Sequence, residues 1–497
     1  MAHSTPYLPD PSWEDQIAPR VWLSLYYVFR DAPSATATTP ADVAHSTYQH
    51  LVDQLHANLE ATLHHLPHFS ARVVDDPRPS HEGRVRLVPG LGGLLHEWEK
   101  DDDEKLGVED VVRILENADA AGSGPGTRLG LPRPWDRDRD DGTARVDVLR
   151  VREGVVVGFH AHHAVADMRA LAVFAKCVAE GVDAGLFSSS SSSSSAGEAM
   201  MMGNQPHQQK ESWDESSFNL AFKSTYFRLE DGGGPAQPET RHRNLRYDGK
   251  SRKYRVSRAK CKELLREEVT PPEDQDLPAG RDGCSLFAFL AAKLGAHALM
   301  ARIDADTEPT GQVHDVGTLW IPVDVRDVID KGGIRTVGNA VIPAVVTLGT
   351  EFWLDGSRGE KAWARRVTAS VIQRITSQIA LVRSLGYQRR RDASLRALAW
   401  GDPRGLGVRY DAAAGNWLQV NDSRRFGADT EFPGYGRAEA VRRHLPTAPG
   451  IVFHPVRAGD DALVLTMTLP EEAMEILQKH PGFLSFMESI KAAAADS

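Results

Sequence analysis

Cysteine, excess positive charge and long apolar runs are all scarce in this chain of 497 residues. Its three cysteines, Cys177, Cys261 and Cys284, are odd in number and far apart, which argues against a disulfide framework or a zinc site and fits a reducing compartment. The net charge of −10, without a basic stripe interleaved with aromatic residues, argues against a nucleic-acid partner. Apolar runs fall short of the roughly 20 residues of a membrane span, and the first residues lack the apolar core of a signal peptide. We therefore expect a cytoplasmic protein that binds no membrane.

The length of the chain exceeds that of one ordinary hydrophobic core, which predicts two domains. Strand-like and helix-like segments alternate along most of it, a pattern typical of the α/β class. The serine run Ser188–Ser195 opens a low-complexity stretch that cannot bury a core. We therefore predict an N-terminal lobe over residues 1–186, a flexible crossover linker over 187–215 and a C-terminal lobe over 216–497.

The stretch GVVVGFHAHHAVADMRALAVF, from Gly154 to Phe174, joins a strand-like pattern to a helix-like one. β-Branched and aromatic residues alternate up to the histidines, and apolar residues recur at helical spacing from Met168 onwards. His163 and Asp167, spaced as H-x-x-x-D, therefore lie at a strand-to-helix junction, where rigid elements fix a short exposed turn. Because the chain has 19 histidines, roughly one such spacing is expected by chance. The position of His163 and Asp167 at a strand-to-helix junction, more than their spacing, supports a functional role for them.

Three interpretations of these histidines stay open. General-base catalysis needs an imidazole that titrates near neutral pH and a partner that orients it, and His163 with Asp167 supplies both groups. The alternative is a structural histidine at the end of a strand. Metal binding is a third reading, because His160 and His162 would project to the same face of a strand. No further ligands follow at metal spacing, so we expect no metal, and we expect His162 to be structural.

Three further motifs follow the histidine cluster along the chain. They are the VDVR of Val323–Arg326, the GNA of Gly338–Ala340 and the EFPGYGRAEAVRR of Glu431–Arg443. Together with the HHAVAD that contains His163 and Asp167, they occur in the order found in BAHD-type acyl-CoA-dependent acyltransferases. The chain resembles this family over nearly its whole length, and within it the fungal branch that includes trichothecene 3-O-acetyltransferases.

The resemblance implies an α/β fold of two chloramphenicol-acetyltransferase-like lobes, each a mixed sheet packed with helices, with a channel between them. His163 would act there as general base and take the proton of an acceptor hydroxyl that attacks the thioester of an acyl-CoA. Asp167 would turn away from the substrate and shape the histidine turn by pairing with an arginine. Arg326 is the candidate, because an arginine at a strand end can pair bidentately with a carboxylate.

The family motif DFGWG is represented here by EFPGYG. Glu431 stands for the acid, Pro433 is an extra residue, and Tyr435 replaces the usual tryptophan. The motif has a structural role in the family, and the resemblance assigns its tight backbone to Gly434 and Gly436.

Contacts to the CoA cosubstrate are also carried over from the resemblance. The candidates are Ser285, Asn421, Arg424 and Arg425. The cluster Arg389–Arg391 is a second source of positive charge for the CoA phosphates. It follows a helix predicted over Glu360–Leu385, so interaction with the helix C-terminus explains it equally well.

The function that follows from the resemblance is acyl-CoA-dependent O-acyl transfer, most simply acetyl transfer, to a hydroxylated small molecule of secondary metabolism. No tightly bound cofactor is expected, and the protein is expected to be a monomer. An N-acyltransferase or condensation-type amide-forming enzyme is the alternative, because the doubled histidine His162-His163 also occurs there. A third reading is a pseudo-enzyme that only binds ligand, against which His163 and Asp167 argue.

Overall fold

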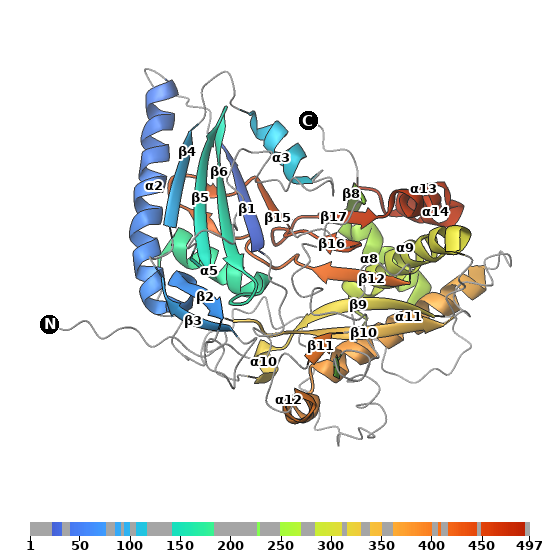
Figure 1. Cartoon of the computed structure of the whole chain (residues 1–497). Helices are drawn as coiled ribbons and strands as arrows, with labels where there is room; N and C mark the ends of the chain where they lie inside the picture. The colour runs from blue at the N-terminus through green and yellow to red at the C-terminus, as the bar shows by residue number, and fades with distance from the viewer. Residues whose placement is uncertain are drawn as a thin grey trace.

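Two large β-sheets and the helices packed on them make up the described part of the chain (Figure 1). The computed structural model describes residues 22–31, 40–75, 85–90, 94–99, 106–116, 142–182, 226–228, 249–269, 284–310, 316–329, 338–349, 361–399, 406–408, 416–444 and 449–492. The predicted linker over 187–215 lies outside these ranges, so the proposed division into lobes stays a prediction at that boundary.

The first sheet has five strands in the order β15-β1-β6-β5-β4. Neighbouring strands are antiparallel, except that β4 runs parallel to β5. The strands are β1 (Trp22–Arg30), β4 (Leu94–Glu99), β5 (Ala144–Val151), β6 (Gly154–His162) and β15 (Ala440–His444). The strand that the sequence predicts before the histidine turn is therefore β6, and it lies in the middle of the sheet.

Helices cover both faces of the first sheet. On one face, α2 (Pro40–His65) and α5 (Met168–Glu180) pack against Leu25 and its neighbours in a large core cluster. On the other face, α3 (Val108–Glu116) packs against Val28. Because both faces are covered, every residue of β6 is buried, which explains its continuous apolar pattern. A rigid strand thus carries the turn that contains His163.

The second sheet has six strands in the order β10-β9-β12-β16-β17-β8. They are β8 (Lys250–Ser257), β9 (Val316–Asp324), β10 (Val341–Gly349), β12 (Trp417–Asp422), β16 (Gly450–Phe453) and β17 (Ala462–Leu469). β12 is parallel to both β9 and β16, and the other pairs are antiparallel. The carboxyl ends of β9, β12 and β16 therefore meet at one edge of this sheet.

One core cluster joins the second sheet to its helices. These helices are α8 (Arg258–Val269), α9 (Leu286–Thr310), α11 (Lys361–Val382), α13 (Glu471–Lys479) and α14 (Pro481–Ile490). The segment Leu286–Asp306 of α9 is long and apolar enough to cross a membrane, so the expectation that no run has this length is wrong. Two thirds of its apolar window, 67%, is buried in the protein, as in a core helix.

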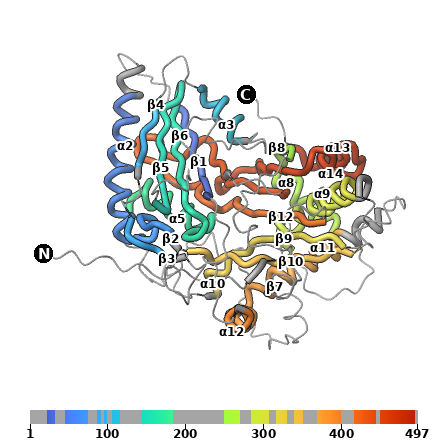
Figure 2. The backbone as a smooth tube through the Cα atoms, viewed as in Figure 1, coloured from blue at the N-terminus to red at the C-terminus, as the bar shows by residue number. Residues whose placement is uncertain are grey.

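The C-terminal part of the chain also completes the first sheet. β15 pairs with β1 as an edge strand, with Arg443 opposite Leu25, and then the chain returns to the second sheet as β16 (Figures 1 and 2). A division into N-terminal and C-terminal lobes by sequence position alone does not include this crossing of β15 into the first sheet. The crossing brings the EAVRR segment against the sheet that carries His163.

Smaller elements complete the fold. They are the pairs β2 (Ala71–Asp75) with β3 (Val85–Pro89), β7 (Tyr226–Arg228) with β11 (Leu406–Val408) and β13 (Glu431–Phe432) with β14 (Gly436–Arg437), the 3₁₀ turn η1 (Pro67–Ser70), and the helices α10 (Arg326–Ile329) and α12 (Leu385–Ala399). Arg389–Arg391 lie inside α12, so the expectation that they follow a helix C-terminus is wrong.

Candidate active site

The turn after β6 places His163 at the junction between the sheet and α5. The backbone N–H of Val165 donates to the carbonyl of His162 at 2.9 Å, which closes the turn. Asp167 then caps α5, with its Oδ1 accepting the backbone N–H of Ala170 at 2.9 Å. An aspartate at this position satisfies a backbone donor that the helix leaves free. The spacing H-x-x-x-D is thus the length of this turn.

Asn339 holds the His163 ring. The Asn339 Oδ1 atom lies 2.9 Å from His163 Nδ1, and the Asn339 amide nitrogen donates to the His163 carbonyl oxygen. The second bond fixes which end of the amide faces the ring, so Oδ1 is an acceptor there and Nδ1 carries the hydrogen. The Nε2 atom of His163 is therefore the unprotonated nitrogen of the neutral ring.

The electrostatic setting favours this neutral ring. Burial lowers the pKa of His163 below its usual value of 6.5, and the positive charge of Arg443 acts in the same direction, whereas Asp167 opposes both. His163 is nevertheless partly exposed, unlike His160 and His162, which are buried. A partly exposed imidazole that is neutral at pH 7 can accept a proton from a ligand.

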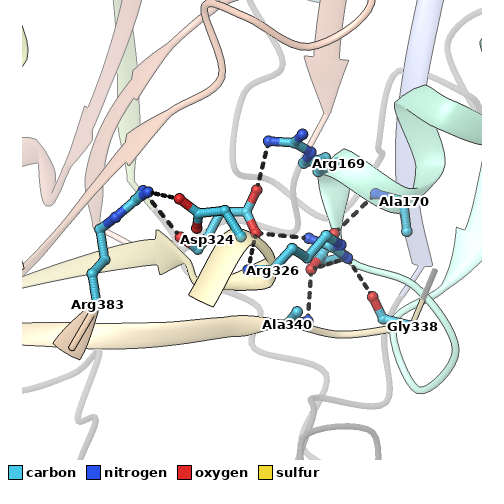
Figure 3. Close-up of polar contacts among 9 residues, drawn as sticks. Arg169, Ala170, Asp324, Arg326, Gly338, Ala340 and Arg383 are labelled. Carbon is cyan, nitrogen blue, oxygen red and sulfur yellow. Dashed lines mark hydrogen bonds and ion pairs between the residues drawn. The ribbon is translucent and has the colours of Figure 1, made fainter. Parts of the chain in front are cut away.

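Asp167 is paired with Arg326, the candidate that the resemblance gave, and Figure 3 shows the polar contacts around Arg326. Its Oδ2 atom accepts Arg326 Nη2 at 2.7 Å and the backbone N–H of Ala340 at 2.9 Å. The same Arg326 nitrogen donates to the Gly338 carbonyl. Both charged side chains are buried, with exposures of 2% for Asp167 and 8% for Arg326. This ion pair joins the start of α5 to β9 and β10 and so holds the two sheets together behind His163.

Asp324 extends the network toward solvent. Its Oδ1 accepts the backbone N–H and Nη1 of Arg326 at 3.1 Å each, and its Oδ2 accepts Arg169 Nη1 at 2.9 Å. Arg383 donates to the Asp324 carbonyl at 3.3 Å and pairs with Asp327 (Figure 3). The pairs of Arg169 and Arg383 are exposed and contribute little stability. They orient Arg326 rather than the substrate.

A second histidine cluster lies on the opposite face of the first sheet. His160 Nδ1 is 2.8 Å from Ser24 Oγ, and its Nε2 is 3.1 Å from Asp147 Oδ2. Asp147 also accepts Arg145 Nε at 2.6 Å and Trp98 Nε1 at 3.1 Å. All members except Arg145 and Trp98 are buried in the strands. The side chains of Ser24, His160 and Asp147 contact one another in the order of a catalytic triad. Because all three are buried, a substrate cannot reach them.

The metal reading is not supported by the contacts of these histidines. His160 contacts Ser24 and Asp147, and His162 Nδ1 accepts the backbone N–H of Ala164 at 3.1 Å. Within the described ranges, no group of three histidine, cysteine or carboxylate side chains is arranged to hold a metal ion. The cysteines, which belong to the described residues, are all free.

The EFPGYG segment folds as the hairpin β13–β14, away from His163. Gly434 and Gly436 have φ values of +74° and +67°, a conformation that favours glycine. A side chain at Gly434 would also meet Thr47 Cγ2 of α2 at 2.9 Å. Glu431 pairs with Arg437 at 3.1 Å, but both are exposed. The tight backbone predicted for the two glycines is present, and Gly434 lies against α2, whereas a side chain at Gly436 would meet nothing within 4 Å.

The residues predicted to contact CoA are spread over the second sheet. Ser285 caps α9 by accepting the backbone N–H of Ala288 at 3.0 Å. Asn421 is buried at the end of β12, and Arg425 is exposed just beyond it. Arg424 is bound by both oxygens of Asp422, at 2.8 Å and 2.7 Å. Their role toward CoA stays a prediction, and for Arg424 it competes with this intramolecular pair.

Two residues at the site were not assigned by the sequence. Asn339 lies in the GNA motif and Arg443 in EAVRR, so both motifs were noticed without a role for these side chains. Their partners are far away in the sequence, since Asn339 contacts a residue 176 positions earlier. The available signal was a polar residue two positions before a strand for Asn339 and inside a short strand for Arg443.

Comparison with solved structures identifies the fold. F. graminearum TRI101 complexed with coenzyme A and T-2 mycotoxin has a TM-score of 0.67 at 12% identity, covering 96% of this chain and 98% of its own. Vinorine synthase has a TM-score of 0.56 at 12% identity, covering 97% and 93%. The starter condensation domain of rhizomide synthetase has a TM-score of 0.51 at 12% identity, with the same coverage. No family model and no curated protein sequence matches the chain.

These neighbours confirm the predicted fold class, and with it the resemblance to BAHD-type acyltransferases at the level of the fold. At such low identity the likeness says nothing direct about chemistry. The predicted channel between the lobes stays a prediction.

Proposed function

We propose that the protein is an acyl-CoA-dependent O-acyltransferase that transfers an acyl group, most simply acetyl, to a hydroxyl of a small molecule. The observation that carries the proposal is the contact between Asn339 and His163, which leaves the Nε2 lone pair of a neutral imidazole at a partly exposed turn. A general base requires this protonation state. The buried ion pair of Asp167 with Arg326 keeps the turn in place behind it.

In the proposed reaction, Nε2 of His163 accepts the proton of the acceptor hydroxyl while its oxygen attacks the thioester carbonyl. Collapse of the tetrahedral intermediate expels the CoA thiolate, which takes the proton back from His163. Asn339 accepts the Nδ1 hydrogen throughout and stabilises the imidazolium that forms transiently. Asp167 holds α5 and Arg326 and does not contact the substrate.

The structural neighbours support this reading over the alternative. TRI101 is described in complex with coenzyme A and a small-molecule mycotoxin, and it has the higher TM-score, 0.67, against 0.51 for the condensation domain. The free cysteines fit our further proposal that the enzyme works as a cytoplasmic monomer.

The test is to incubate the pure protein with acetyl-CoA and matched panels of hydroxylated and aminated small molecules, following thiol release and product mass. O-acetylated products formed only with alcohols support the proposal. Products formed only with amines favour the N-acyl alternative, and thiol release without any acylated product contradicts acyl transfer. The pseudo-enzyme reading predicts that CoA binds without thiol release from acetyl-CoA.

A further inference from the structure

Arg443 reaches the histidine turn from β15, the edge strand that the C-terminal part of the chain adds to the first sheet. It lies opposite Leu25 in the register, and alternation along the strand puts both on the face covered by α5. Val441, two residues earlier, packs in the same core cluster. The positive charge of Arg443 is close enough to His163 to lower the pKa of that ring.

The charge of Arg443 is not balanced by a contact within the described chain. Its Nη1 donates to Ser423 Oγ, and its Nε is buried without a hydrogen-bond partner among the described residues. Burial lowers the pKa of Arg443 to about 9, although Asp167 acts in the opposite direction. Both Asp167 oxygens are already occupied by Ala170, Arg326 and Ala340. Arg443 as a whole is partly buried, but an enclosed guanidinium nitrogen without a partner is costly and calls for an explanation.

His454 adds a second unpaired polar atom beside Arg443. It follows β16, whose parallel neighbour β12 ends just before Ser423, and the backbone N–H of Ser423 donates to the Phe453 carbonyl at 3.0 Å. His454 is 3% exposed, its Nε2 lies 2.8 Å from Thr466 Oγ1, and its Nδ1 has no partner in the described part of the chain. Since the threonine hydroxyl can either donate or accept, Nδ1 is able to present a hydrogen.

His454 and Ser423 follow the carboxyl ends of the parallel strands β16 and β12, where α/β sheets commonly bind ligands, and Arg443 reaches Ser423 from β15. Burial and the nearby charges of Arg442, Arg443 and Lys253 keep the pKa of His454 well below 6.5, so its ring is a neutral donor and Arg443 supplies the positive charge for a carboxylate. The planar guanidinium also binds a carboxylate through two parallel hydrogen bonds. An incoming carboxylate would supply partners for both unpaired nitrogens.

We propose that Arg443 and His454 form a subsite that binds a carboxylate carried by one of the two substrates and holds that substrate next to His163. The proposal rests on the acyl transfer proposed above and narrows its substrates to acids. The carboxylate has two possible sources. It belongs either to a hydroxy-acid acceptor or to the acyl group of a dicarboxylic acyl-CoA.

Calorimetric titration of the full chain with matched probes distinguishes the sources. The acceptor arm uses 3-hydroxybutyrate and 3-hydroxybenzoate, each against its methyl ester, and the donor arm uses malonyl-CoA against acetyl-CoA. We expect the wild type to bind the acid tighter by about tenfold or more in one arm, the usual effect of a charged hydrogen bond. Arg443→Gln should remove this preference and change binding of the uncharged partner by less than about twofold.

Two further variants separate binding from folding. Arg443→Lys keeps the positive charge but lacks the planar guanidinium, so it should retain part of the preference for acids. Arg437→Gln removes an exposed arginine of the same segment and should leave the preference intact. Because Arg443→Gln removes an unbalanced buried charge, it should melt no lower than the wild type. A purely structural Arg443 predicts a lower melting temperature and equal weakening of acids and esters.

Equal binding of charged and uncharged probes by the wild type in both arms would overturn the subsite, as would an acid preference that survives in Arg443→Gln. Failure of the proposed function has a different signature, because neither acetyl-CoA nor malonyl-CoA would then release thiol with any acceptor while the binding preference persisted.

Discussion

His160 and His163 lie three residues apart in one segment, and the fold gives them different partners and different access to solvent. His160 points to a carboxylate, Asp147, and is 1% exposed in the sheet. His163 points to an amide, that of Asn339, and lies in a partly exposed turn. A carboxylate stabilises a protonated ring, whereas an amide orients the ring without adding charge. The setting of His163 is the one that suits a base, and that of His160 suits a structural bond.

The same comparison applies to the aspartates. Asp147 contacts a histidine and has no access to substrate, and Asp167 belongs to the H-x-x-x-D motif but contacts Arg326 instead of His163. Burial raises the pKa of Asp147, but His160 and Arg145 outweigh it and leave the pKa lowered. The fold brings Arg326 to Asp167 and His160 to Asp147, whereas Arg145 lies two residues from Asp147 on the same strand.

The largest effect is expected from Asp167→Asn, because it removes the buried carboxylate partner of Arg326 and leaves Asp324, which is less buried, as its remaining ion-pair partner. Loss of one partner of a buried pair costs about 3–5 kcal/mol in the free energy of unfolding. Urea denaturation at pH 7 measures this loss. The double variant Asp167→Asn/Arg326→Met removes both charges and should be less destabilised than the single one. A single variant that unfolds like the wild type but has no activity would show that Asp167 acts on the reaction itself.

A smaller loss of stability is expected from Asp147→Asn in the buried cluster of Ser24, His160 and Asp147. The amide keeps the bond from Trp98, while Arg145 is partly exposed and can turn toward water, so the cost should be about 1–3 kcal/mol. Activity per folded molecule should stay within about threefold of the wild type. The two readouts are urea denaturation and initial rates on the same preparation. A stable variant with strongly reduced turnover would place the His160 cluster in the reaction.

Asn339→Asp gives His163 the kind of partner that His160 has. A carboxylate at this distance should raise the pKa of His163 by about one pH unit or more. A raised pKa leaves less unprotonated base at a given pH, so the acid limb of kcat/KM should move upward from its position below 6.5. Asn339→Leu is the control, with a lower rate but no upward shift. An unchanged pH profile in Asn339→Asp would mean that Asn339 does not set the state of the ring.

The strand and the helix on either side of the His163 turn could be predicted from the sequence, whereas the distant residues that contact the turn could not all be predicted. The valine-rich pattern predicted β6 and the apolar spacing predicted α5, and the resemblance to a known family implied the contact of Asp167 with an arginine, for which Arg326 was the candidate. Asn339 was missed because it meets His163 only after β10 is folded against β9. A contact between distant strands leaves no periodic signal in either segment.

The pairing of β15 with β1 in the first sheet could not be predicted for a related reason. The AVRRH of β15 resembles any short strand, and nothing in it states that its partner is β1 rather than a neighbour in sequence. The helix predicted over Glu360–Leu385 is α11, which ends at Val382, but the second helix that begins directly after it, α12, was missed.

The turnover of His163→Ala, measured beside that of His162→Ala, tests the central claim most directly. His162 precedes His163 but is buried and accepts a backbone hydrogen bond. With acetyl-CoA and an accepted alcohol, His163→Ala should lower kcat/KM by about 10²–10⁴-fold, the contribution of a positioned general base, and keep the melting temperature of the wild type. His162→Ala should lose less than about tenfold. Turnover like that of the wild type in a folded His163→Ala protein would contradict the account.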